Sequence, residues 1–428
     1  MSALQGYLHS FSEWDDLFLT YYAINPDKTI ATTNFTRGEF LILAARAKSF
    51  LVSRGIARGD HVCHYFSSNT VEDLAFRLAS VFIGSIPVTV NWDADTPERV
   101  LYKITVTNCK LILCDSSTSK LTLEFIENNL AQTNITMQSI VDAKNCLISS
   151  EGDDKASDGG AMLAMMMMGE GETSIKHNSG LEMSSTRIVI FTSGTTGNPK
   201  GVRLSHSNYE TNRSTFEQFL QVRDDPSIIV STVVINPLHH TNSTSFTDWM
   251  LRRKGAKLHL FQRYTTPYWK ILAQLGHDEI ERCTTVGMQD SKSRLVAPAV
   301  SRHFDFLESL ANSNKLYKSE EWISTGLNRV NFLIGSAPVG PSTVARLRRF
   351  AKKLPLVRFG STETTLQVMG TPRSLSEEVR LSSFKRGWNH MNSQGKKQPG
   401  YYVGQQHQNN TEVMIVESVS KDDGEAFL

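Results

Sequence analysis

One twelve-residue stretch constrains this sequence more than any other. It reads FTSGTTGNPKGV over residues 191–202, and it directly follows the apolar run RIVI at residues 187–190. A short β-branched run bounded by polar residues is typical of a buried strand. Gly194 and Gly197 tolerate the positive φ angles and close approach of a tight turn, whose backbone N–H groups can form a concave anion site. Because hydroxyl side chains and Lys200 add further donors, the stretch predicts a phosphate-binding loop.

The loop does not have the Walker A order, in which serine or threonine follows a Gly-Lys pair. Here Pro199 precedes Lys200 and Gly201 follows it. A flexible surface hairpin is the alternative interpretation, and the predicted strand before the loop argues against it.

The same stretch resembles the phosphate loop of the adenylate-forming superfamily, which includes acyl- and aryl-CoA synthetases, luciferases and the adenylation domains of peptide synthetases. That loop reads [YF]-T-S-G-[ST]-T-G-x-P-K-G-V, and residues 191–202 match every position. The resemblance implies that ATP and AMP are bound by Thr192, Ser193, Gly194, Thr195, Thr196, Gly197 and Lys200.

Composition narrows the class of protein. The chain has 428 residues, 40% of them hydrophobic, which is enough for more than one subdomain. The chain has 45 Lys plus Arg and 43 Asp plus Glu, so its net charge is +2. This near-neutral balance favours neither nucleic acid nor an anionic membrane as partner. We identify no apolar run near the ~18 residues of a transmembrane helix and no secretory signal. Five scattered cysteines indicate reduced thiols, and the C-terminus is not an SKL signal, so we expect a cytoplasmic protein.

Strand and helix patterns alternate along the chain, which predicts an α/β fold. Thr36 and Glu39 form a capping box at the start of a helix over residues 36–55. Further helices are predicted over 70–83, from Pro97, and over 205–222, 241–253, 290–313 and 341–353. Strands are predicted over 61–66, 86–90, 110–115, 227–235, 257–261, 282–288, 330–336 and 354–360. This alternation indicates two stacked βα layers, with mostly parallel sheets and flanking helices, plus a small β-rich C-terminal part.

Four segments follow from this pattern and from the resemblance. Residues 1–150 form a first βα subdomain, and residues 187–371 form a second one that carries the ATP-binding motifs. Between them, residues 151–186 are rich in Gly, Ser, Asp and Glu and predict a disordered insertion. The resemblance implies that residues 372–428 begin a β-barrel subdomain. The family's ribose-binding aspartate, hinge and mobile C-terminal domain with its lysine are then expected to be absent.

Two later motifs complete the nucleotide site that the resemblance implies. IGSAPVG, residues 334–340, resembles the family's G-G-A-P-[LM], which packs against adenine, and places Gly335, Ser336, Ala337 and Pro338 there. FGSTE resembles Y-G-x-T-E, and it places Phe359, Gly360, Ser361, Thr362 and Glu363 beside the nucleotide. Thr362 would donate to the α-phosphate, and Glu363 would be the Mg²⁺ ligand, since Mg²⁺ prefers carboxylate and phosphate oxygens.

A third motif concerns the acid substrate. NPLHHTNS, residues 236–243, resembles P-[LM]-[FY]-H-x-x-G, in which the histidine borders the carboxylate pocket, and His240 takes that place. His239 replaces an aromatic residue and Ser243 a glycine, which suggests an altered pocket. A metal site at the two histidines is the alternative, and it lacks further ligands at suitable spacing.

Together the motifs imply ATP-dependent activation of a fatty or aryl carboxylic acid to acyl-AMP and then to acyl-CoA. Lys200, Thr362 and Glu363 would be catalytic, with ATP, Mg²⁺ and CoA as cofactor or co-substrate and a small-molecule carboxylic acid as partner. Two alternatives remain open: a peptide-synthetase-like adenylation domain, of which Asp248-Trp249 is a loose echo, and a non-catalytic nucleotide-binding fragment. The motifs specify neither the acid nor the oligomeric state.

Deleting residues 152–178 should leave the melting temperature and nucleotide binding almost unchanged. The segment offers few β-branched or aromatic side chains to offset an ordering cost of ~1–2 kcal/mol per residue. Calorimetry of the deletion variant checks this expectation, and limited proteolysis of the intact chain should cut within this segment first. Resistance of the segment while the rest of the chain is cleaved would show that it is packed.

Overall fold

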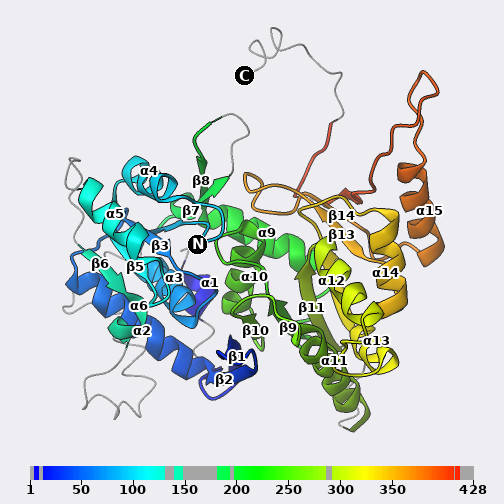
Figure 1. Ribbon diagram of the computed structural model, residues 1–428, viewed down its shortest axis with the longest axis horizontal. Helices are drawn as coiled ribbons and strands as arrows, with labels where there is room; N and C mark the ends of the chain where they lie inside the picture. Colours follow the sequence, from blue (N-terminus) through cyan, green and yellow to red (C-terminus); the bar gives the residue numbers. More distant parts are fainter. Residues whose placement is uncertain are drawn as a thin grey trace.

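The computed structural model describes residues 4–8, 13–130, 139–147, 181–192, 197–285, 292–408 and 410–414. The predicted insertion at 151–186 therefore lies outside the described residues, apart from its last six positions. Two sheets face a shared layer of helices, and further helices cover their outer sides (Figure 1). This arrangement confirms the predicted α/β class with two βα layers.

The six-stranded sheet has the order β6-β5-β3-β4-β7-β8. Its strands are β3 (His61–Tyr65), β4 (Ile86–Thr89), β5 (Cys109–Cys114), β6 (Ser139–Asp142), β7 (Thr186–Thr192) and β8 (Lys200–Ser205). Neighbouring strands are parallel except β7 and β8, which pair antiparallel with Thr192 opposite Lys200. The phosphate-loop sequence therefore joins two paired strands and has these two residues at its base.

The nine-stranded sheet has the order β15-β14-β13-β12-β11-β9-β10-β1-β2. Its strands are β1 (Leu17–Ile24), β2 (Ile30–Thr36), β9 (Ile229–Val234), β10 (Lys257–Phe261), β11 (Ser293–Ala299), β12 (Val330–Ile334), β13 (Leu356–Phe359), β14 (Met369–Gly370) and β15 (Gln405–Gln406). The six strands from β13 to β1 run parallel. The division between sheets does not fall at residue 187, since β1 and β2 lie in this sheet whereas β7 and β8 lie in the other.

Helices form three layers around the sheets. They are α1 (Gln5–Leu8), α2 (Arg37–Ser53), α3 (Val71–Ile83), α4 (Pro97–Thr107), α5 (Lys120–Leu130), α6 (Ala143–Leu147), α9 (His206–Phe219), α10 (Thr241–Arg252), α11 (Tyr268–Thr285), α12 (Ser301–Asn312), α13 (Glu320–Leu327), α14 (Pro341–Ala351) and α15 (Glu377–Trp388). Among the described helices, none is both long and apolar enough to cross a membrane.

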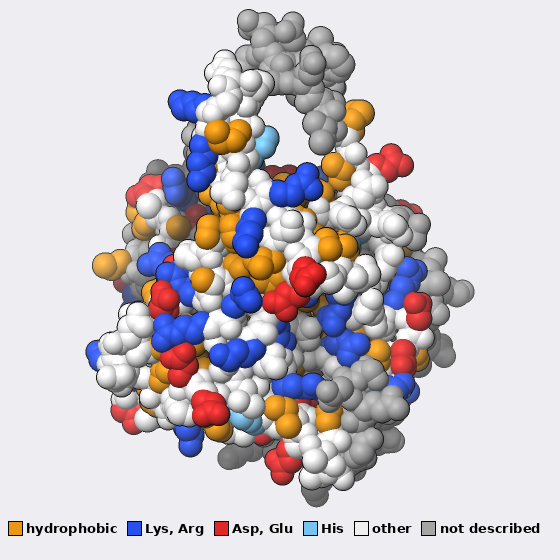
Figure 2. All heavy atoms as spheres, turned by 90° about the vertical axis from the view of Figure 1, so that its right-hand side faces the viewer, with side chains coloured by type: hydrophobic (Ala, Val, Ile, Leu, Met, Phe, Trp, Pro, Cys, Tyr) orange, Lys and Arg blue, Asp and Glu red, His pale blue; other side chains and the backbone are white. Residues whose placement is uncertain are grey.

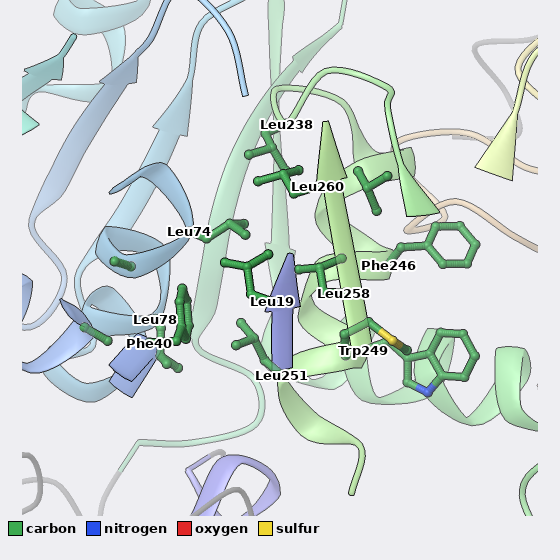
Figure 3. Close-up of a cluster of buried hydrophobic side chains, with 14 of the residues drawn as sticks. Leu19, Phe40, Leu74, Leu78, Leu238, Phe246, Trp249, Leu251, Leu258 and Leu260 are labelled. Atoms are coloured by element: carbon green, nitrogen blue, oxygen red, sulfur yellow. The ribbon is translucent and has the colours of Figure 1, made fainter. Parts of the chain in front are cut away.

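Because side chains alternate along the strands, they pack into separate hydrophobic clusters on the two faces of each sheet. Val62 of β3 packs into the central cluster between the sheets, whereas Cys63 packs against α4 and α5. The central cluster joins α2 and α3 to α9, α10 and both sheets. Figure 3 labels members of this cluster on α2, α3, α10, β1 and β10. A third cluster packs α11–α14 against the outer face of the nine-stranded sheet. Parallel strands buried on both faces are expected to read as the apolar runs seen here.

The helix start predicted from the capping box is confirmed, whereas two predictions between residues 282 and 313 are not. Thr36 caps α2 as predicted: its Oγ1 accepts from the Glu39 N–H at 3.1 Å, and a Glu39 carboxylate oxygen accepts from the Thr36 N–H at 2.7 Å. The interpretation of residues 282–288 as a strand is wrong over 282–285, because α11 continues to Thr285, and residues 286–288 lie outside the described residues. The helix predicted over 290–313 is wrong in its first part, since β11 occupies 293–299 and α12 begins only at Ser301.

A buried charge network joins α10 to the strand that leads into the phosphate loop. Asp248 of α10 accepts a 2.5 Å hydrogen bond from the Tyr7 hydroxyl of α1. The same carboxylate lies 3.6 Å from Arg187 of β7 and 3.6 Å from Arg252. All four side chains are buried. Burial raises the pKa of the Tyr7 hydroxyl, with the Asp248 charge adding to the effect, so Tyr7 stays a neutral donor.

Replacing Asp248 with Asn should destabilise the protein by about 3–5 kcal/mol, because it leaves the buried guanidinium of Arg187 without its carboxylate and removes one of the two carboxylates beside Arg252. The matched control is Asp225→Asn, whose partner Lys292 lies 2.6 Å away at a site where both side chains are more than a third exposed. That change should cost far less, because exposed ion pairs contribute little to stability. Urea unfolding of both variants measures the difference, and equal losses would contradict the structural role given to Asp248.

Candidate active site

The phosphate loop leaves the six-stranded sheet at the end of β7 and returns along β8. The predicted nucleotide ligands Ser193, Gly194, Thr195 and Thr196 lie outside the described residues, so their placement stays a prediction. At the base of the loop, the Thr192 Oγ1 donates to the Lys200 carbonyl oxygen at 3.5 Å. Gly197 and Lys200 are exposed, and no atom lies within 4 Å of where a Gly197 Cβ would be.

The FGSTE segment forms a tight turn directly after β13. A Cβ on Gly360 would lie 1.7 Å from the Leu366 carbonyl oxygen, so only glycine fits there. The Leu366 N–H closes the turn by donating to the Ser361 carbonyl oxygen at 2.9 Å. Thr365 and Leu366 adopt φ angles of 53° and 98°, which are unfavourable for residues of their kind. Backbone strain of this sort concentrates at functional sites.

Lys200 and Glu363 come from different sheets, and the Lys200 charge favours the ionised form of the Glu363 carboxylate. Hydrogen bonds from its own backbone and from the Ser361 side chain lower the pKa of Glu363, and the Lys200 charge lowers it further. The fold therefore brings the charge of the predicted phosphate-binding lysine to the predicted metal ligand, although the two residues are far apart in the sequence. Thr362, the third residue predicted to be catalytic, is half-buried in the same turn.

The IGSAPVG segment lies beside this turn, because β12 and β13 are parallel neighbours that end at the same edge. Gly335 is buried, and a Cβ on it would come 2.9 Å from the Arg358 carbonyl oxygen. Ser336 has a φ of 65°, and Ser336, Ala337 and Pro338 are exposed. Phe359 presents half of its surface to solvent. The predicted adenine-binding residues thus lie at the carboxyl ends of parallel strands, where ligands of open α/β sheets bind.

His240 precedes α10 as its N-cap residue and is exposed. His239 is buried, with its ring 4.3 Å from both the Trp92 ring and the His240 ring. Burial, helped by the neighbouring His240, lowers the pKa of His239 to about 2, so this imidazole is neutral at physiological pH. Among the described residues, no group of three or more His, Cys, Asp or Glu side chains could hold a metal ion. Ser243 donates to the Asn236 carbonyl oxygen at 2.7 Å and holds the start of α10.

Glu363 suits the Mg²⁺ ion that the resemblance implies. Its carboxylate is exposed and has a lowered pKa, so it is ionised at neutral pH. Mg²⁺ commonly binds through one or two carboxylates together with substrate phosphate oxygens, so a cluster of protein ligands is not required.

Sequence reasoning missed one residue at this site. Arg358 is a buried cation immediately before FGSTE, and it bonds to Asn242 two residues after His240. The available signal was a charged residue inside the otherwise apolar strand LPLVRF.

Three comparisons place this geometry among known proteins. Over 188 residues the chain is 25% identical to long-chain-fatty-acid–CoA ligase 5 of Rattus norvegicus, covering 42% of this chain and 26% of that enzyme. Its fold is similar to the N-terminal domain of FACL13 from Mycobacterium tuberculosis, with a TM-score of 0.62, 16% identity and coverage of 89% and 80% of the two chains. It is also similar to o-succinylbenzoate CoA synthetase (MenE) from Bacillus subtilis in complex with the acyl-adenylate intermediate OSB-AMP, with a TM-score of 0.60, 18% identity and coverage of 92% and 63%.

The two sheets and their shared helical layer define the adenylate-forming fold. The family model described as AMP-binding enzyme matches residues 21–422. The chain therefore belongs to the AMP-binding enzyme family. It covers about a quarter of the length of the rat relative and less than two thirds of the Bacillus subtilis chain.

Replacing Gly360 with Ala should cost about 3 kcal/mol or more and abolish nucleotide binding, because the new methyl group meets a backbone oxygen that cannot move freely. Gly400→Ala is the control, since the nearest atom to its Cβ is 3.7 Å away. Thermal unfolding and nucleotide titration of both variants test this. An unchanged melting temperature for Gly360→Ala would contradict the tight turn.

Proposed function

We propose that this chain activates a carboxylic acid with Mg·ATP, and that the whole protein transfers the acyl group to CoA. The observation that carries the proposal is that the IGSAPVG segment and the FGSTE turn end neighbouring parallel strands, with positive φ angles at 336, 365 and 366. The Lys200 charge also lowers the pKa of Glu363 in this turn. This effect links the phosphate loop to the turn that would hold the α-phosphate, which is the pairing that adenylation requires. The relatives named above, a fatty-acid ligase and a synthetase crystallised with an acyl-adenylate, support the same chemistry.

The reaction needs no covalent bond to the protein. An oxygen of the acid's carboxylate attacks the α-phosphorus of ATP, the bond from that phosphorus to the bridging oxygen breaks, and pyrophosphate leaves. Lys200 would hold the departing phosphates as a point charge. Thr362 would orient the α-phosphate, and Phe359 with the 336–338 backbone would hold the adenine. Rate enhancement then comes from positioning and from charges placed in advance.

Glu363 would bind Mg²⁺, which when bound neutralises charge on the phosphate oxygens. His240 would border the acid's carboxylate, because the resemblance implies this role and the residue is exposed at the start of α10.

The peptide-synthetase alternative is less well supported. Its suggested pocket residue, Asp248, is engaged by Tyr7, Arg187 and Arg252 and is buried away from the nucleotide turn. A non-catalytic nucleotide-binding fragment remains the second candidate, and it predicts binding without exchange.

The mixture of positive and negative side chains on the surface is consistent with a small-molecule partner. Figure 2 shows Lys and Arg side chains interspersed with Asp and Glu over one face of the molecule. On helices α12–α14, Arg346 pairs with Asp305 at 2.5 Å and Arg349 with Glu320 at 2.8 Å. Mixed charges of this kind offer no continuous basic field to a nucleic acid.

Mg·ATP should bind, and Lys200→Ala should weaken it by about 10- to 100-fold, as expected for a charged hydrogen bond to phosphate. Glu363→Gln should weaken binding in the presence of Mg²⁺ but have little effect in EDTA. Lys110→Ala, a partly exposed lysine that pairs with Asp60, is the control. Titration calorimetry provides the measurement. Absence of heat at millimolar nucleotide, from protein shown to be folded, would overturn the proposal.

ATP–pyrophosphate exchange with a panel of fatty, aryl and short acids then separates the two candidate functions. Exchange that depends on an added acid supports activation, whereas nucleotide binding without exchange for any acid supports the non-catalytic alternative.

A further inference from the structure

Arg358 is the side chain at which the candidate site segments meet. Along β13, Leu356 packs into the central cluster and Val357 into the outer one, so Arg358 points back toward the helices between the sheets. It is only 4% exposed.

The contacts of Arg358 reach three motifs. Its Nη2 donates to the Asn242 Oδ1 at 2.8 Å, in the first turn of α10 that His240 caps. Its guanidinium lies 5.2 Å from the centre of the Phe246 ring, one turn further along the same helix. Its stem and backbone pack against Gly335 of the IGSAPVG segment, and its own chain continues into the FGSTE turn.

The charge of Arg358 is uncompensated. Other buried arginines of this protein face a carboxylate: Arg77 faces Asp73, Arg187 faces Asp248 and Arg253 faces Glu217. No carboxylate of the described residues pairs with Arg358, and its Nη1 has no hydrogen-bond partner among them. An arginine stays protonated inside proteins, and a buried charge without a counter-ion is strongly unfavourable.

The surroundings of Arg358 are polar where a long acyl chain would need apolar walls. The first turns of α10 read TNSTS, and all five side chains are buried. The hydroxyls of Thr241 and Ser245 have no hydrogen-bond partner in the described part of the chain. Ligand pockets place a few polar groups where they fix orientation, and unsatisfied buried groups select ligands that pair with them.

We propose that Arg358 determines acid specificity: the preferred substrate is a short acid that carries a second carboxylate, and this distal carboxylate pairs with the Arg358 guanidinium. The inference rests on the proposed function. The reacting carboxylate would lie at His240, and the guanidinium bonds to Asn242 two residues further along the chain, so a short acid would place its second carboxylate there. A carboxylate accepts from the guanidinium more strongly than the neutral Asn242 amide does.

The test uses stable sulfamoyl analogues of three acyl-adenylates: succinyl, which carries the second carboxylate, butanoyl, which has the same chain length without it, and decanoyl. The protein should bind the succinyl analogue about 10- to 100-fold more tightly than the butanoyl one, the range expected for a charged hydrogen bond. Arg358→Met should lose this preference and bind the decanoyl analogue more tightly. Arg358→Lys should keep part of it, because the charge remains without the planar fork.

Arg373→Met is the matched control, since Arg373 also donates to an asparagine oxygen, that of Asn331 at 2.9 Å, but lies away from the three motifs. It should keep the succinyl preference. Arg358→Met should also melt no lower than the parent protein, because removing an uncompensated buried charge is neutral or stabilising. A lower melting temperature with an unchanged succinyl-to-butanoyl ratio would assign Arg358 a purely structural role.

Failure of the inference and failure of the proposed function give different results. If the analogues bind but the intact protein does not prefer succinyl over butanoyl, the specificity proposal is overturned while adenylation stands. If the folded protein binds neither Mg·ATP nor any analogue, both are overturned.

Discussion

The buried carboxylate of Asp248 holds together the parts on which the site depends. It belongs to α10, whose first turn carries His240 and Asn242, and it faces Arg187 on β7, five residues before Thr192 at the base of the phosphate loop. Tyr7 ties the N-terminal helix to the same group. Because an unpaired charge is costly in this interior, the two arginines and the carboxylate have few alternative arrangements. The ion pair between Asp248 and Arg187 therefore fixes the distance between α10 and the β7–β8 hairpin.

Around this link, the site is assembled at one edge of each sheet. Lys200 lies at the start of β8, which pairs with β7. The IGSAPVG segment follows β12, and Glu363 lies in the turn after the neighbouring strand β13. The elements behind these groups are well packed and the groups themselves are exposed, which suits a site that must bind and release a charged nucleotide. Positive φ angles at this site fall at Ser336 and at residues 365–366, where Gly360 lets the turn close on itself. Stable strands on either side can maintain such a conformation.

Several features could be predicted because they depend on neighbours in the sequence. The strand RIVI, the capping box of Thr36 and Glu39, and the order of the nucleotide motifs needed only short windows of residues. The strand predicted at 282–288 was wrong over residues 282–285, because these residues end α11, whose buried face includes Trp269, Leu272 and Ala273. The membership of β1 and β2 in the nine-stranded sheet was not predictable, because β1 pairs with β10, more than 200 residues away.

The sequence by itself determined the family, and it predicted the phosphate loop and the residues of the nucleotide site, because these depend on local backbone requirements and on the chemistry of short motifs. Tertiary structure alone decided which distant groups act on one another. Lys200 lowers the pKa of Glu363 only because two sheets meet across a shared helical layer. Arg358 is likewise an ordinary arginine in the sequence. It becomes a buried cation without a carboxylate partner, beside Asn242 and Phe246, only because β13 turns it toward α10, where no described carboxylate pairs with it.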